Sequence, residues 1–267
     1  MILFRIFLIT SISLACCSLS AQFQVERALP TNAIGLEVSE LGEVYLKFFQ
    51  RIELLDKDWK VRYSFSERRL SADTRLDVTK SLKPLVYFRD YNSGVLLDNT
   101  LSQQSSELIF DWKRFGQVGA LCHSIGNHYW IFDVAAMQLV RVDYSLIEVQ
   151  RSGDLSMLLG VALDPSFMVE EEDHLYILDK KKGVFVFDLF GTYSHRLDFI
   201  DFSAIQVVGQ HVYLMSNKQV VSYNRLTKEQ VHQILPYDDV VDVRVRGKSL
   251  VILRKNELVQ ISLSTID

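Results

Sequence analysis

Residues that cross-link, kink or loosen a backbone are scarce in this sequence. The 267 residues include 3 cysteines, 4 prolines and 12 glycines. This scarcity excludes a small protein stapled by disulfides, a collagen-like repeat and a proline-rich disordered chain. An excess of positive charge is also missing, because the formal net charge is −4. We therefore do not expect the protein to bind nucleic acid or anionic lipid through general electrostatic attraction.

Signatures of common catalytic sites and of membrane spans are missing as well. The sequence contains no Gly-x-Ser-x-Gly, no glycine-rich phosphate loop and no His-Glu-x-x-His. Beyond the N-terminal segment, no apolar run reaches the about 20 residues that a bilayer-spanning helix needs. Sustained apolar periodicity of 3.6 residues is absent too, which excludes folds that alternate helices with parallel strands. The 48% of apolar residues are nevertheless enough for a sizeable core.

Residues 1–21 have the features of a secretory signal peptide. Arg5 supplies a positive charge ahead of a short apolar run, Ile6–Ala15. Small residues follow, and we expect cleavage after Ser20 or Ala21. The sequence therefore predicts export, to the periplasm or cell envelope of a bacterium.

A second interpretation of this segment is a degenerate lipoprotein signal, in which Cys16 or Cys17 would carry a lipid anchor. Under either interpretation, residues 22–267 are expected to form a single domain. Cleavage after residue 21 would leave Cys122 as the last cysteine, so no internal disulfide is expected. Cys122 lies in an apolar strand-like run and is predicted to be a buried, inert thiol.

A repeat of about 41 residues runs through the rest of the chain. Each copy contains a short apolar strand, a polar turn and a second apolar strand, with room for two more strands. The equivalent residues of the six copies are Tyr45, Tyr87, Trp130, Tyr176, Tyr213 and Val251. Four short strands in a unit of this length are typical of a propeller blade. The sequence therefore predicts an all-β fold, a six-bladed β-propeller of four-stranded blades.

The two ends of the repeat region complement each other. The last copy ends after its third strand, near Ile261–Leu263, and one strand is missing from it. The segment Phe23–Leu29 alternates apolar and polar residues ahead of the first copy. We expect this N-terminal strand to complete the last blade, which would close the ring and leave no long edge strand open.

Two copies resemble the NHL and YWTD repeats of six-bladed propellers. The resemblance rests on Tyr129–Asp133 with Val142 and Asp143 downstream, and on Leu175–Asp179 with Phe187–Gly191 downstream. It implies the same six-bladed fold. Glycine is sparser here than these repeats usually show, and WD40, Kelch and quinoprotein signatures do not occur.

Candidate binding residues are concentrated in loops of one face. In a propeller, the loop between the second and third strands opens on the same face as the crossover to the next blade; we call this the crossover face. Aromatic and arginine side chains at loop tips are typical of protein-binding surfaces. The partner-binding residues predicted on this basis are Phe48, Phe49, Tyr91, Trp112, Arg114, Phe115 and Tyr237. An apolar insertion over residues 153–166 is expected to form a cap or short helix on this face.

The inner strands offer few groups for catalysis. Their charged residues are mainly Glu37, Asp77, Asp242 and Arg244, which do not form a recognisable metal-binding or nucleophilic set. We interpret the acidic run Glu170–Asp173 as a solvated turn, because no calcium-binding loop pattern accompanies it. No catalytic residue, metal site or cofactor is predicted.

The leading hypothesis is therefore an exported, non-enzymatic propeller that binds an envelope or secreted protein. One alternative is a metal-dependent lactonase or hydrolase with a metal in the channel. Another is a carbohydrate-binding propeller that uses Trp112, Tyr91 and Tyr237. Fold alone does not decide between them, because propellers host unrelated functions.

Overall fold

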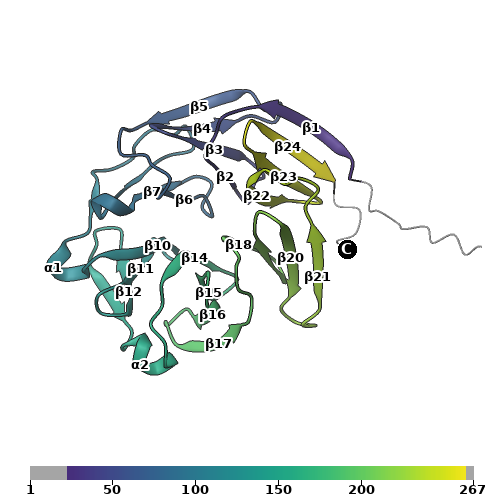
Figure 1. Cartoon of the computed structure of the whole chain (residues 1–267). Helices are drawn as coiled ribbons and strands as arrows, with labels where there is room; N and C mark the ends of the chain where they lie inside the picture. The colour runs from purple at the N-terminus through teal and green to yellow at the C-terminus, as the bar shows by residue number, and fades with distance from the viewer. Residues whose placement is uncertain (1–22, 263–267) are drawn as a thin grey trace, which may run out of the picture.

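The computed structural model describes residues 23–262, which form six four-stranded antiparallel sheets. The sheets surround a central channel as the blades of a propeller (Figure 1). This arrangement confirms the predicted all-β, six-bladed β-propeller. The predicted signal peptide, residues 1–21, and the predicted lipid-anchor positions Cys16 and Cys17 lie outside the described residues.

The first three blades are continuous in sequence. From the channel outward, their strands are β2 (Gly35–Val38), β3 (Val44–Phe48), β4 (Arg51–Leu55) and β5 (Val61–Ser66); β6 (Arg75–Asp77), β7 (Leu85–Phe88), β8 (Ser93–Leu96) and β9 (Leu108–Ile109); and β10 (Val118–Ser124), β11 (His128–Asp133), β12 (Gln138–Asp143) and β13 (Glu148–Arg151).

The fourth and fifth blades are also continuous, whereas the sixth combines the two ends of the described chain. From the channel outward, the strands are β14 (Pro165–Glu171), β15 (His174–Asp179), β16 (Gly183–Asp188) and β17 (Tyr193–Leu197); β18 (Ala204–Val208), β19 (His211–Met215), β20 (Gln219–Asn224) and β21 (Gln230–Ile234); and β22 (Val240–Arg246), β23 (Ser249–Arg254), β24 (Glu257–Ser262) and β1 (Val25–Pro30).

Helical structure in residues 23–262 is confined to three short segments between strands. These are the 3₁₀ helix η1 (Arg89–Tyr91) and the α-helices α1 (Trp112–Phe115) and α2 (Leu155–Leu159). None of these segments has the length and apolar character needed to cross a membrane.

The second strand of each blade makes the repeat visible in the sequence. In β15, for example, every residue from Leu175 to Asp179 is buried, because both faces of a blade are covered by its neighbours. An outer strand such as β5 instead alternates exposed and half-buried residues. Continuous apolar runs therefore mark the second strands, whereas the polar outer strands give a weak signal.

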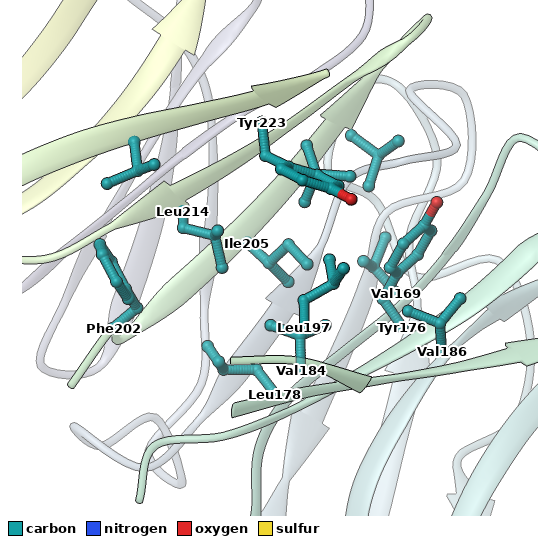
Figure 2. Packing of buried hydrophobic residues seen from close by; sticks show 13 residues of the cluster. Val169, Tyr176, Leu178, Val184, Val186, Leu197, Phe202, Ile205, Leu214 and Tyr223 are labelled. Carbon is teal, nitrogen blue, oxygen red and sulfur yellow. The ribbon is translucent and has the colours of Figure 1, made fainter. Parts of the chain in front are cut away.

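The core is divided among the contacts between blades. Six clusters of buried apolar side chains occur in the described residues, one between each pair of neighbouring blades. Figure 2 shows the cluster between the fourth and fifth blades, where Tyr176 and Leu178 of β15 pack near Ile205 of β18 and Leu214 of β19. Because every blade contributes to two clusters, the stability of each blade depends on its neighbours.

The N-terminal strand closes the ring, as the sequence predicts. β1 pairs antiparallel with β24, and Leu29 lies opposite Leu258. Side chains strengthen this pairing, because Gln260 Nε2 and Ser249 Oγ both donate hydrogen bonds to the carboxylate of Glu26. β24 is therefore covered rather than exposed at the edge of the sixth blade.

Candidate functional site

Two short helices lie in consecutive crossovers on either side of the third blade (Figure 1). An aspartate precedes each of them: Asp111 accepts a hydrogen bond from Lys113 N at 2.9 Å, and Asp154 accepts one from Ser156 N at 2.8 Å. Such caps satisfy N–H groups that the first turn of a helix leaves without a partner. The helix expected within residues 153–166 is confirmed as α2.

Each of these helices is anchored by one buried side chain and exposes others. Phe115 of α1 and Leu155 of α2 are each 1% exposed. Trp112, Met157 and Leu158 are 56%, 83% and 61% exposed, respectively. Side chains this apolar are costly to hold in water, so their concentration on two small helices marks a candidate interaction surface.

The turn between β11 and β12 contacts both helices. Leu155 N, at the start of α2, donates a hydrogen bond to the Met137 carbonyl at 2.8 Å. α1 ends at Gly116, where a Cβ would lie 2.7 Å from Asp133 Oδ1, so the turn fits closely against glycine. Met137 itself is half-buried. We call one apolar set on this face the crossover ridge: Trp112, Met137, Met157 and Leu158.

Two of the predicted partner-binding residues are packing residues. Phe48 is 5% exposed and lies between the sixth and first blades, with the Arg51 guanidinium 3.9 Å from its ring centroid. Phe115 is 1% exposed and packs edge-to-face against Phe110, with 6.2 Å between the ring centroids. The surface exposure expected for Phe48 and Phe115 is therefore wrong, because both rings fill gaps between blades.

The other predicted partner-binding residues reach the surface to different degrees. Phe49, Tyr91 and Trp112 are 64%, 55% and 56% exposed, and Arg114 is exposed as well. Tyr237 is half-buried, and the Arg254 guanidinium lies 4.3 Å from its ring centroid. That these residues bind a partner stays a prediction.

Alanine substitutions should show that the two aromatic residues of α1 have different roles: Phe115 stabilises the fold, whereas Trp112 is exposed and does not. Phe115→Ala is expected to lower the free energy of unfolding by about 3–5 kcal/mol, because it opens a cavity between the second and third blades. Trp112→Ala should change it by less than about 0.5 kcal/mol, because most of the indole is already in water. Chemical denaturation of both variants measures the difference, and equal losses would contradict the assignment of Phe115 as the anchor.

The central channel contains two adjoining cavities. One, of about 330 Å³, opens among the loops between first and second strands, and the other, of about 160 Å³, opens among the crossovers. Both cavities are lined by the same five residues where they meet: Glu37, Arg75, Leu76, Phe167 and Arg244. At its middle, the channel is therefore lined by both apolar and charged side chains. It opens on both faces of the propeller, through one cavity on each face.

A buried ion network joins the sixth blade to the first inside the channel. Arg244 is 4% exposed, and its guanidinium donates to both carboxylate oxygens of Glu37, at 2.8 and 2.7 Å. It also contacts Asp242, whose second oxygen accepts a hydrogen bond from Leu36 N at 3.2 Å. Burial raises the pKa of Glu37, and Arg244 opposes that rise. The network is thus a second link across the seam that β1 closes.

Lys47 enters the channel from the second strand of the first blade. Its side chain crosses Gly35, where a Cβ would lie 2.9 Å from Lys47 Cε. Its Nζ donates to the carbonyls of Ala72 and Thr74 at 3.0 and 2.6 Å. Burial, with repulsion from Arg75, lowers the pKa of Lys47 to about 8. The crossover end of the channel thus holds a cation that is costly to keep charged.

The opposite end of the channel is acidic. Glu171 lines the larger cavity, and burial, with repulsion from Glu40 and Asp77, raises its pKa to about 7. The adjacent Glu170 is a structural acceptor, which receives hydrogen bonds from Ser124 Oγ, Ile125 N and Trp130 Nε1 of the third blade. The interpretation of this run as a solvated turn is therefore wrong for these two glutamates, since sequence alone does not show the neighbouring blade.

Glu171 should make stability depend on pH near neutrality. Its folded-state pKa of about 7 exceeds the ordinary value of 4.5, so the folded state binds the proton more tightly. Protonated Glu171 therefore contributes to the free energy of unfolding in full below pH 4.5, and this contribution is lost as pH rises through 7. Glu171→Gln should match the wild-type melting temperature at pH 5 and exceed it by a few degrees at pH 8. A melting-temperature difference that is independent of pH would contradict this titration.

All four channel residues expected from the sequence line the cavities: Glu37, Asp77, Asp242 and Arg244. Sequence reasoning missed Arg75 and Lys47. Arg75 lies two positions before Asp77 on the same strand, so the two-residue periodicity of strands could have found it. Lys47 carries no such signal, because it belongs to a second strand.

Groups suited to covalent or metal chemistry are sparse in the part of the chain that the structure describes. Within residues 23–262, no group of three or more His, Cys, Asp or Glu side chains is placed to hold a metal ion. Cys122 is fully buried, and burial raises its thiol pKa well above the usual value. The prediction of a buried thiol is confirmed.

Comparison with solved structures relates the fold to several propeller proteins. A catalytically inactive virginiamycin B lyase from Staphylococcus aureus, solved with quinupristin, is 9% identical, with a TM-score of 0.63 over 91% of this chain and 100% of that chain. BamB from Moraxella catarrhalis is 12% identical, with a TM-score of 0.52 over 87% of this chain and 83% of that one. BBS1N, solved in complex with ARL6DN, is 14% identical, with a TM-score of 0.52 over 86% and 77%.

The comparisons extend to fold and no further. No family model and no curated protein matches the sequence. The resemblance of two repeats to NHL and YWTD sequences therefore stays a prediction, and at these identities the solved structures share architecture alone. What this chain has in common with them is the β-propeller fold.

Proposed function

We propose that the protein is exported to the cell envelope and binds a protein partner through the crossover ridge. The observation that carries this proposal is the exposure of Trp112, Met157 and Leu158 on two capped and anchored helices. These helices are inserted in consecutive crossovers and are not part of any blade. Their exposed apolar side chains, Trp112, Met157 and Leu158, therefore contribute little to the propeller itself.

The composition of the ridge favours a protein over a small ligand. Aromatic and methionine side chains are enriched where proteins meet, and a tryptophan at the centre of such a patch often contributes most of the binding energy. The ridge stands on the outside of a turn and two helices, whereas small-molecule sites are concave. A propeller of similar fold, BBS1N, was solved in complex with ARL6DN, which supports protein binding by this architecture.

A capture experiment with matched variants tests the ridge. The test variant is Trp112→Ser with Met157→Ser and Leu158→Ser. The control variant is Leu41→Ser with Ile125→Ser and Phe190→Ser, which removes three exposed apolar side chains from loops of the opposite face. Both should keep the wild-type melting temperature, because all six side chains are at least 55% exposed.

Tagged wild-type protein and the control should retain the same partner from envelope extracts. The ridge variant should retain it at least about tenfold less, since loss of interface anchors costs this much or more. The partner would then be purified and titrated directly against the three proteins. Equal affinity of the ridge variant and the wild type would overturn the proposal, and glycan binding lost in the ridge variant would favour a carbohydrate ligand instead.

Export and anchoring have a separate test. Fractionation of cells that express the full chain should place the protein in the envelope, with an N-terminus after residue 20 or 21 under plain secretion. Under lipidation, the mature chain would instead begin at Cys16 or Cys17, and its replacement by serine would release the protein from the membrane fraction. Recovery of an uncleaved chain from the cytoplasm would overturn the export proposal.

A further inference from the structure

At the crossover end of the channel, one cation has no hydrogen-bond or ion-pair partner among residues 23–262. Arg75 is half-buried on β6, and within the described residues no hydrogen bond or ion pair involves its guanidinium. Guanidinium groups have five donors and cannot lose their charge, so an unpaired one near the core is costly. Burial and repulsion from Arg89 lower the pKa of Arg75, and the attraction of Glu37, Asp73 and Asp242 offsets this only in part. A group kept at such a cost is often kept for binding.

The charges around the smaller cavity do not balance. Its lining holds the cations Lys47, Arg75 and Arg244 and the carboxylates Glu37 and Asp242. Arg244 already satisfies both carboxylates. Lys47 donates to two carbonyls, which leaves one of its three donors. This lining therefore has one positive charge in excess, and in the part of the chain that the structure describes the Arg75 guanidinium donates no hydrogen bond.

The adjoining cavity offers a different environment. The larger space, of about 330 Å³, is walled by apolar side chains that include Val169, Val207 and Val245. Leu76 and Phe167 continue this wall into the smaller cavity. A molecule that spans both spaces would meet cations at the crossover end, apolar side chains along its body and the acidic mouth with Glu171 at the far end.

We propose that the channel binds a small organic acid, with its carboxylate at Arg75 and Lys47 and its apolar body in the larger cavity. Arginine and carboxylate form two parallel hydrogen bonds, which are among the strongest in proteins. The carboxylate also supplies the negative charge that the lining lacks. This inference does not depend on the crossover ridge or its partner.

A titration with matched probes tests the site in the wild-type protein. The probes are hexanoate, the neutral isostere hexanamide and inorganic phosphate, followed by ligand-observed NMR. Hexanoate should bind saturably, and hexanamide should bind at least about tenfold more weakly, because only a charged group matches the cations. Equal affinities, or no saturable hexanoate binding, would overturn the proposal. Phosphate binding without hexanoate binding would overturn it in favour of an inorganic anion.

Variants locate the carboxylate. Arg75→Gln should weaken hexanoate at least about tenfold and leave hexanamide unchanged. Arg75→Lys keeps the charge but loses the paired hydrogen bonds, so it should weaken hexanoate less than Arg75→Gln does. Arg62→Gln, which changes an exposed arginine of β5 that lines neither cavity, is the control and should bind as the wild type does. Wild-type hexanoate affinity in Arg75→Gln would overturn the assignment.

Stability distinguishes a binding role from a structural one. Because the Arg75 guanidinium has no partner in the described residues, its removal should leave the melting temperature unchanged or raise it. A clear fall in the melting temperature of Arg75→Gln would show that Arg75 supports the fold, and would contradict its role as an unpaired ligand group.

Discussion

Deletion of residues 23–29 is expected to lower the melting temperature by about 10 °C or more and to make the protein self-associate. The deletion uncovers the outer edge of β24, including the ladder opposite Leu258 and Ile261, both of which are 0% exposed in the closed ring. It also removes Phe23 and Leu29, which pack against clusters on either side of the sixth blade. We therefore expect the free energy of unfolding to fall by several kcal/mol. Each kcal/mol lowers the melting temperature by about 2–4 °C in a domain of this size.

The control for this deletion keeps the strand and changes only its exposed side chains. Val25→Thr with Ala28→Thr preserves the backbone pairing with β24, and both positions are exposed. This variant should melt within about 2 °C of the wild type. Thermal unfolding and size-exclusion chromatography measure both effects. A deletion variant that stays monomeric and melts like the wild type would show that β1 is dispensable for closure.

Replacement of Arg244 by methionine is expected to cost about 3–5 kcal/mol of unfolding free energy. The substitution leaves two half-buried carboxylates, Glu37 and Asp242, without their shared cation. Burial already raises the pKa of Glu37, and loss of Arg244 removes the main opposition to that rise, so the variant should recover part of its stability in acid. The difference between wild type and Arg244→Met should therefore be larger at pH 8 than at pH 5.

Two comparisons isolate the buried network. Adding Glu37→Gln to Arg244→Met should restore part of the lost stability, because one uncompensated charge disappears. Arg196→Met is the surface control, since the Arg196–Asp198 ion pair is exposed and should contribute less than about 1 kcal/mol. If Arg244→Met and Arg196→Met behaved alike in chemical denaturation, the network would not be a structural link across the seam.

The fold could be predicted because burial in a propeller repeats with the blades. Second strands lie between neighbouring blades and are apolar on both faces, so segments such as Leu175–Asp179 stand out at regular spacing. Closure could be predicted because the last repeat lacked one strand and Phe23–Leu29 had the alternation to supply it. Both inferences use patterns that are local in sequence.

The sites could be predicted only in part, because they depend on contacts between blades. At the turn after β3, one position separates the buried Phe48 from Phe49, which is 64% exposed. Composition cannot tell these two phenylalanines apart. The Lys47 side chain reaches the channel only because Gly35, its pairing partner on β2, has no side chain in the way. This close approach depends on the pairing of β2 with β3, which the sequence alone does not show.

The closed ring also links the stability of the protein to the completeness of its synthesis. Glu26 and Gln260 contact each other although 234 positions separate them, so β1 is made first and paired last. Pairing across such a distance is slow to form during folding. A truncated product that lacks β24 keeps β1 unpaired and one blade open, and proteases cleave such exposed segments readily. Incomplete chains are therefore expected to be cleaved by proteases faster than the complete protein.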